Sequence, residues 1–329
     1  MALTSDTHSF DTVDDAVEYY FEVGWTDGLP IVPPTPERVQ TMLAAAGIEP
    51  DVELGGVPTR NVTVTAEKAA VNAVMAGCRP DYFPVVVAAV RAFLAPEANA
   101  HSTTATLAGA AHAVIVNGPV RNELEIESGQ ACFGPGFRAN ATIGRALRLV
   151  IRNACRAVPG VLDRASFSWP LRYSFCFGEN EEVSDWTPLH VQLGYACEQS
   201  VVTIQSILHF FPVTEFEPEP SEILDAIVAM ARYRGMMRDE WAGDGRSIVL
   251  VIGEEHQRRL IDGGMNKESI QDHLWPLMTA EDVSKTDKKL NLAAPGNIMV
   301  VAAGGPGLAQ SWLLQPHLAC PTSEVVSPS

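Results

Sequence analysis

The chain has 329 residues, and its 23 Lys and Arg against 40 Asp and Glu give a formal net charge of -17 at pH 7. Hydrophobic residues make up 47% of the chain and charged residues 19%, which is typical of a compact globular protein and not of a disordered one. A chain this acidic repels phosphate backbones and anionic lipid surfaces, so we expect neither nucleic acid nor a membrane as a partner.

The compartment follows from three further features. No window reaches the roughly 18 uninterrupted apolar residues of a membrane-spanning helix, and the first fifteen residues are acidic and polar where a secretory signal would be basic and then apolar. The cysteines form no CxxC pair and no zinc-ligand spacing. We therefore expect a cytoplasmic protein with free thiols, no metal and no cofactor. The cysteines are Cys78, Cys132, Cys155, Cys176, Cys197 and Cys320.

Apolar periodicity and turn residues predict alternating helices and strands. The segment Trp25–Pro34, with an Asp-Gly turn and three prolines, is expected to be an extended loop that either covers a pocket or packs on the surface. The expected helices span residues 12–23, 35–47, 65–77, 82–94, 139–153, 254–262 and 267–275. The expected strands span residues 61–64, 113–116, 172–177, 201–205, 248–252 and 298–302.

This alternation predicts an α/β or α+β fold, with a mixed sheet and flanking helices. The order strand, helix, glycine turn, helix occurs at 61–94 and again at 248–275, which suggests a degenerate internal repeat. The Pro- and Glu-rich segment Phe211–Pro220 is the best internal boundary. We therefore expect a main α/β region over 1–215 and a second α/β region over 216–329 packed on it, with a loose tail after residue 320.

The segment from Cys132 to Arg145 is the strongest candidate for a binding site. Glycines and a proline bend the chain just before a helix, which leaves free backbone N–H groups beside the cationic side chains of Arg138 and Arg145. This pattern favours binding of a carboxylate or phosphate, although the arginines could equally pair with nearby acids. Phosphate-loop and dinucleotide-binding glycine motifs are both absent. The proposed substrate-binding residues are Arg79, His101, Asn117, Arg138, Asn140, Thr142 and Arg145.

Two substitutions follow from this hypothesis. Lys cannot reproduce the forked pair that a guanidinium makes with a carboxylate, so Arg138→Lys should weaken substrate binding more than folding. The companion substitution Arg148→Lys is expected to be mild.

An acidic segment, Gly178–Glu182, directly follows a predicted buried strand. Carboxylates at strand ends are often part of active sites, so Glu179 and Glu181 are candidate catalytic acids or bases. Replacing either with Gln should lower kcat by about two to four orders of magnitude with little change in stability, with Glu182 as the solvent-facing control. The alternatives are solvated loop acids, which are commoner, and a metal site with His190.

Cys78 is the third catalytic candidate. It stands beside Arg79 and before a helix start, and both features lower a thiol pKa and favour the nucleophilic thiolate. It would act as a nucleophile or redox thiol, and brief alkylation should modify it before Cys155 and Cys176. The alternative is a buried, inert cysteine.

Several strings of the sequence together resemble a poorly characterised bacterial family associated with UGSC-motif selenoproteins and their cysteine counterparts. The strings are GWTDGLPIVPPTPERV, AGCRPDYFPVV, VNGPV, FGPGFRANATIGRALRLV, FCFGENEE followed by WTPLHV, and VAAGGPG, which lie within about residues 15 to 310. The Gly-Ser-Cys of the UGSC site itself is absent here. The resemblance therefore implies that any selenocysteine or equivalent cysteine chemistry belongs to a partner protein or a separate gene product.

These observations lead to one functional hypothesis and one alternative. We expect an enzyme or large enzyme subunit, of lyase or hydrolase type, that cleaves or adds a carbon–heteroatom bond in a small anionic organic molecule, in a homo- or hetero-oligomer. Glu179 and Glu181 would transfer protons, and Cys78 would take part as the thiol. The alternative is a noncatalytic scaffold or binding subunit for a thiol- or selenol-containing partner.

Overall fold

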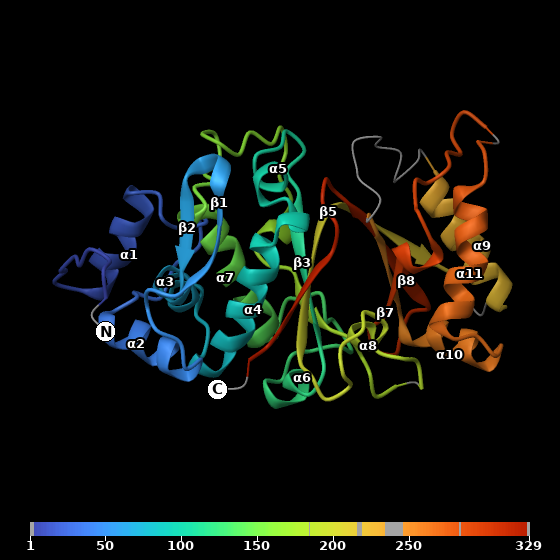
Figure 1. Ribbon diagram of the computed structural model, residues 1–329, viewed down its shortest axis with the longest axis horizontal. Helices are drawn as coiled ribbons and strands as arrows, with labels where there is room; N and C mark the ends of the chain where they lie inside the picture. The colour runs from blue at the N-terminus through green and yellow to red at the C-terminus, as the bar shows by residue number, and fades with distance from the viewer. Residues whose placement is uncertain (1–2, 184, 216–218, 234–245, 283, 328–329) are drawn as a thin grey trace.

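The computed structural model describes residues 3–183, 185–215, 219–233, 246–282 and 284–327, and it confirms a mixed α/β fold (Figure 1). Within these residues one curled mixed sheet has the strand order β4-β3-β5-β8-β6-β7, and β9 pairs with β5 on the side of β8. Its strands are β3 (Ala111–Asn117), β4 (Cys176–Gly178), β5 (Val201–Thr214), β6 (Ile248–Ile252), β7 (Ile298–Ala302), β8 (Gln310–Pro316) and β9 (Thr322–Val325).

Helices cover the two ends of this sheet (Figure 1). On the N-terminal side lie α1 (Val13–Glu22), α2 (Pro36–Ala45), α3 (Ala66–Ala76), α4 (Phe83–Leu94), α5 (Ala100–Thr104) and α7 (Arg138–Leu149), with a separate hairpin of β1 (Glu53–Val57) and β2 (Val62–Thr65). On the C-terminal side lie α9 (Pro220–Arg232), α10 (Glu254–Asp262) and α11 (Lys267–Thr279). The short helix α6 (Val120–Glu123) directly follows β3, and the short helix α8 (Leu189–Gln192) directly precedes β5.

The curl of the sheet creates an inner core between two outer ones. Side chains alternate along β3, so Ala113 and Ile115 point into the inner core, whereas Val114 and Val116 pack with α3, α4 and α7. Strands β6 and β7 alternate in the same way: Val249 and Val251 join the inner core, and Leu250 packs with α9, α10 and α11. Strands β3, β6 and β7 are therefore buried on both faces, which explains their largely apolar sequences.

Two parallel strand pairs bring the ends of distant strands together. β3 and β4 are parallel with α7 between them in sequence, and β6 and β7 are parallel with α10 and α11 between them. Beyond the end of β4, the N–H of Asn180 donates to the carbonyl of Ala302, at the end of β7, over 2.7 Å. Glu179 stands between the end of β4 and Asn180, so it lies where the two halves of the sheet meet.

The predicted strands at 248–252 and 298–302 are confirmed residue for residue. The strand expected at 172–177 is displaced to 176–178, because Pro170 starts a 3-10 turn that ends at Arg172. The strand expected at 201–205 continues to Thr214, so the first part of the proposed boundary Phe211–Pro220 is strand, while 216–218 lie outside the described residues.

Two other expectations are wrong. The repeat aligned 61–64 with 248–252, but β2 belongs to the small hairpin whereas β6 belongs to the main sheet. The segment after residue 320 is not loose throughout, because β9 pairs with Val201–Ile204 of β5 and covers its edge. No single helix in the described parts of the chain is both long and apolar enough to cross a membrane, although the bent pair Pro80–Leu94 and Pro96–Thr104 would qualify by length and composition together.

Candidate functional site

Glu179 is a fully buried carboxylate with a complete set of partners. Its Oε1 lies 2.5 Å from Lys267 Nζ and accepts from the N–H of Ala302, and its Oε2 accepts from Asn117 Nδ2 at 2.6 Å and from the N–H of Leu189 at 2.7 Å. Lys267, the first residue of α11, is itself 1% exposed. The pair therefore joins the two halves of the sheet, and neither carboxylate oxygen is left to take a proton from a ligand.

The neighbouring carboxylates are held by Arg121. Glu181 Oε2 lies 3.1 Å from its guanidinium, and Glu181 Oε1 accepts from the N–H of Gly118 and from Asn117 Nδ2, both at 2.9 Å. Glu182 accepts from Arg121 as well, and these hydrogen bonds and the positive charge of Arg121 hold the pKa of Glu182 below its usual range. The acidic segment is an ion-pair network, in which the amide of Asn117 donates to Glu179 and Glu181. The general-base role proposed for Glu179 and Glu181 gains no support from this geometry.

The polar groups of the glycine-rich segment are directed to the protein's own backbone and acids. Arg138 donates to the carbonyl of Gly77, and Arg145 makes two 2.8 Å hydrogen bonds to the carboxylate of Asp27. Asn140 is buried and bonds to the backbone of Glu127 and Cys132. The arginines of this segment therefore pair with groups of the protein itself, as the alternative hypothesis expects. They do not form an anion site whose donors are free for a ligand.

The remaining proposed binding residues are scattered. Arg79 forms an exposed ion pair with Asp81 and lies over the ring of Tyr82, His101 Nδ1 bonds to Thr59 Oγ1, and Thr142 Oγ1 donates to the carbonyl of Arg138. His101 and Thr142 thus belong to different surfaces of the N-terminal layer. The structure does not assemble the seven residues into one site.

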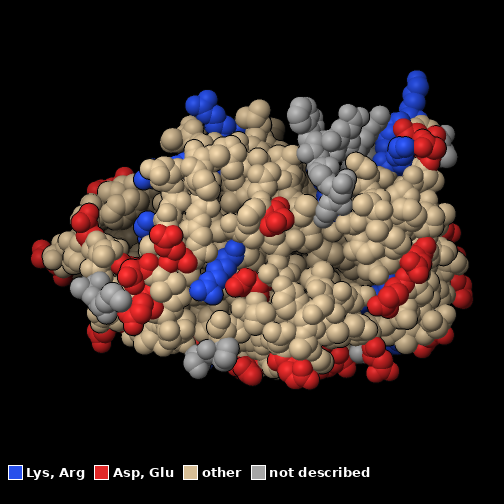
Figure 2. All heavy atoms as spheres, viewed as in Figure 1, with Lys and Arg blue, Asp and Glu red and all other residues tan. Residues whose placement is uncertain are grey.

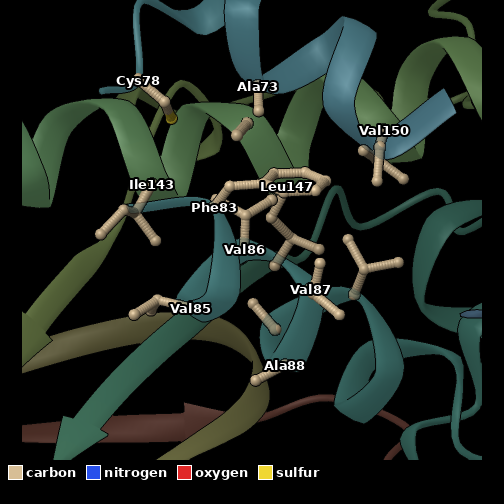
Figure 3. Close-up of a cluster of buried hydrophobic side chains, with 14 of the residues drawn as sticks. Ala73, Cys78, Phe83, Val85, Val86, Val87, Ala88, Ile143, Leu147 and Val150 are labelled. Atoms are coloured by element: carbon tan, nitrogen blue, oxygen red, sulfur yellow. The ribbon is translucent and has the colours of Figure 1, made fainter. Parts of the chain in front are cut away.

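Cys78 is buried at the edge of the hydrophobic cluster formed by α3, α4 and α7, near Ala73 and Ile143 (Figure 3). Its thiol donates to the carbonyl of Thr142, and burial raises its pKa to about 12 although Arg138 and Arg145 partly oppose this. The expectation of a lowered pKa is wrong, because Arg79 turns to Asp81 and the apolar surroundings disfavour the thiolate.

Thiol labelling should therefore follow exposure and not the sequence-based order. At pH 8, brief iodoacetamide treatment of the native protein should modify Cys197, the one thiol classed as exposed among the described residues, before Cys78. Cys132, Cys155 and Cys176, whose pKa values burial also raises, should react only after denaturation. Peptide mass spectrometry gives the order, and Cys197→Ser is the control. Preferential labelling of Cys78 in the folded chain would restore it as a reactive thiol.

Two pockets are lined by arginine side chains and are therefore compared as ligand sites. One, of about 300 Å³, is lined by Cys78, Arg138, Arg38, Pro80 and apolar side chains, so it does bring two of the proposed site residues together. Its guanidinium groups, however, donate to the carbonyls of Gly77 and Pro33. Cations already engaged in this way are less available to a ligand.

The other pocket, of about 360 Å³, is lined by arginines from three places in the chain: Arg148 on α7, Arg152 on the π-helical turn that follows it, and Arg172 on the 3-10 turn before β4. We call it the arginine pocket. Asp27, from the loop Trp25–Pro34, also lines it. The full lining is Asp27, Arg148, Arg152, Ala157, Pro159, Ser168, Trp169, Pro170, Arg172 and Tyr173.

Positive charge exceeds negative charge in and around the arginine pocket. Asp27 pairs with Arg145, and although burial opposes ionisation, that pairing holds the pKa of Asp27 below its usual value. Asp163 pairs with Arg172. Arg148 and Arg152 have no carboxylate within ion-pair distance in the described parts of the chain; Arg148 Nε donates to the carbonyl of Arg172, and Arg152 to that of Gly24.

Burial lowers the pKa of Arg148 to about 9, and repulsion from Arg172 adds to the effect. The same two guanidinium charges reinforce the effect of burial on His112, whose pKa lies well below its usual value. Such a site disfavours its own cations. A bound anion would remove this unfavourable energy.

Several buried donors around the same pocket lack hydrogen-bond partners. Arg148 Nη1, Arg172 Nε and Trp169 Nε1 are shielded from solvent and make no hydrogen bond within the described residues. Buried polar atoms are usually paired, so three unpaired donors on residues that line one pocket make it a candidate ligand site.

Sequence reasoning missed this site although one signal was present. Arg145, Arg148 and Arg152 are spaced i, i+3 and i+7, which places them on one face of a helix, while Ile143 and Leu147 occupy the opposite, buried face (Figure 3). The glycine turn before this helix indicated Arg138 as the anion-binding residue instead. Arg172 carried no signal at all, because only the fold brings it beside α7.

Acidic side chains lie mainly around the periphery of the face drawn in Figure 2, and no group of three or more His, Cys, Asp or Glu is placed to hold a metal ion in the parts of the chain that are described. No model of a known protein family matches the sequence, and a search of curated proteins found no match.

Proposed function

We propose that the protein binds a small organic anion in the arginine pocket. The observation that carries this proposal is the pair Arg148 and Arg152, two cations without an acidic partner in the described structure, beside the unpaired buried donors of Arg148, Arg172 and Trp169. Guanidinium groups bind carboxylates and phosphates through charge-assisted hydrogen bonds, which are roughly twice as strong as neutral ones. The proposal keeps the anionic ligand that the sequence suggests and moves it from Arg138 and Arg145 to this pocket.

The walls of the pocket favour an organic ligand over a bare inorganic ion. Trp169, Pro170, Ala157 and Pro159 supply apolar surface, and the indole of Trp169 is held by stacking on Phe210 at a ring separation of 5.3 Å. A carbon skeleton would contact these walls while its charged group meets the arginines. If the protein is an enzyme for carbon–heteroatom chemistry, we propose that its substrate binds in the arginine pocket. The alternative proposal, a binding subunit for a thiol or selenol partner, uses the pocket without turnover.

Titration calorimetry with benzoate and with benzamide tests the proposal. The two probes share the ring and differ in charge, so benzoate should bind and raise the melting temperature whereas benzamide should not. Equal binding of both would show an apolar pocket without anion recognition. Failure of benzoate, glutarate and inorganic phosphate alike to bind would overturn the proposal. Incubation with any bound probe, followed by NMR, then tests for turnover.

Benzoate affinity should depend on pH in one direction. Benzoate stays ionised above neutrality, but Arg148, whose pKa lies near 9, loses its proton as the pH rises through that value. The dissociation constant should therefore be constant between pH 7 and 8 and increase several-fold by pH 10. Binding near pH 9 should also take up protons, which calorimetry in buffers of different ionisation enthalpy detects. An affinity that stays flat to pH 10 would exclude Arg148 from the contact.

A further inference from the structure

The arginine pocket offers two separate places for negative charge. Arg148 and Arg172 adjoin, since Arg148 Nε donates to the carbonyl of Arg172 at 3.0 Å, and both have an unpaired buried N–H. Arg152 follows Arg148 by four residues and lies on the π-helical turn after the end of α7. Its guanidinium donates through Nε and Nη2 to one backbone carbonyl, that of Gly24.

The charges support the same division. Of the guanidinium groups around the pocket, those of Arg145 and Arg172 are matched by Asp27 and Asp163, which leaves the charges of Arg148 and Arg152 without a matching acid in the described residues. A ligand with one negative charge would compensate only one of them. The apolar surface of Trp169 and Pro170 lines the same pocket and suits an uncharged spacer between two anionic groups.

Resting on the proposed function, we infer that the ligand is a dicarboxylate, with one carboxylate at Arg148 and Arg172 and the other at Arg152, joined by a short carbon chain or a ring. Arg148 and Arg172 present buried donors, so that end is the more strongly desolvated and provides most of the affinity. Arg152, which is closer to solvent, distinguishes dicarboxylates from monocarboxylates.

Matched ligand pairs test the inference. Calorimetry at low salt would compare isophthalate with its monoamide and glutarate with its monoamide, since each pair keeps the shape and changes one charge. At least one dicarboxylate should bind about tenfold or more tightly than its monoamide. In Arg152→Gln that ratio should fall to about twofold or less, because the affinity for the dicarboxylate should fall more than the affinity for the monoamide. Arg164→Gln, which removes an exposed arginine outside the pocket lining, should leave the ratio unchanged.

The outcomes separate the two claims. If monoamides and dicarboxylates bind with equal affinity, the dicarboxylate assignment is wrong and the anion site remains. If the preference for dicarboxylates survives in Arg152→Gln, the placement of the second carboxylate at Arg152 is wrong. If no member of either pair binds, and benzoate and phosphate also fail, the proposed function is wrong and the inference falls with it.

Discussion

Replacing Glu179 with Gln should lower the free energy of unfolding by about 3 to 5 kcal/mol, because it leaves the ammonium group of Lys267 charged and unpaired in the interior. Lys267 Nζ contacts Glu179, and the Lys267 side chain is 1% exposed, so water cannot replace the lost partner. Urea denaturation followed by tryptophan fluorescence measures the change. Glu182→Gln, at a carboxylate that is half-exposed, should change the stability by no more than about 1 kcal/mol.

A second variant separates this electrostatic effect from a loss of shape. In Glu179→Gln with Lys267→Met both charges are gone, and a buried ion pair replaced by neutral side chains of similar volume is often tolerated. The double variant should therefore recover at least half of the lost stability. Suppose instead that Glu179→Gln unfolds at the urea concentration of the wild type while losing turnover of an identified substrate. Glu179 would then be a catalytic group, as its position after a buried strand suggests.

Arg148→Met should change ligand binding and stability in opposite directions. The substitution removes one contact to the anion, and benzoate should bind about 10- to 100-fold more weakly. The folded protein no longer has to bury a cation whose pKa is lowered to about 9, so the melting temperature should be unchanged or higher despite the loss of the hydrogen bond to Arg172. Calorimetry and thermal unfolding on the same samples give both quantities.

Two controls make this result specific to the arginine pocket. Arg164→Met removes a positive charge from the surface, and Arg138→Gln removes the cation that lines the smaller pocket beside Cys78. Both should retain the affinity for benzoate. A loss of binding in Arg138→Gln with retention in Arg148→Met would place the ligand at the glycine-rich segment after all, and would agree with the sequence-based expectation that substitution of Arg148 is mild.

The comparison of sequence with structure shows which information is local. The strands at 248–252 and 298–302 were predictable because five consecutive apolar residues can only be buried, and the helix bounds followed from capping residues such as Thr12 and Thr35. The strand 310–316 was missed because it contains polar residues and a tryptophan in no regular alternation. Its assignment depends on pairing with β5 and β6 and not on its own composition.

The candidate site was less predictable for the same reason. The local sequence predicted correctly that Glu179 lies at the end of a strand. Its partner Lys267 is 88 residues away in the sequence and could not be inferred. Arg138 and Arg145 were given the role of ligand donors because a glycine turn precedes them. Their actual partners, Gly77 and Asp27, come from segments that only the tertiary structure brings close. Long-range ion pairing decides which cations are left over for a ligand.

The late strand β9 has a consequence for the newly synthesised chain. Residues 201–204 of β5 pair with β3 on one side. Their other side pairs with Thr322–Val325, which are synthesised more than 100 residues later. At a translation rate of about 5 to 20 residues per second, that edge stays uncovered for several seconds after β5 has left the ribosome. An open edge of apolar β-strand recruits other strands, so nascent chains of this protein are expected to need a chaperone until translation passes residue 325.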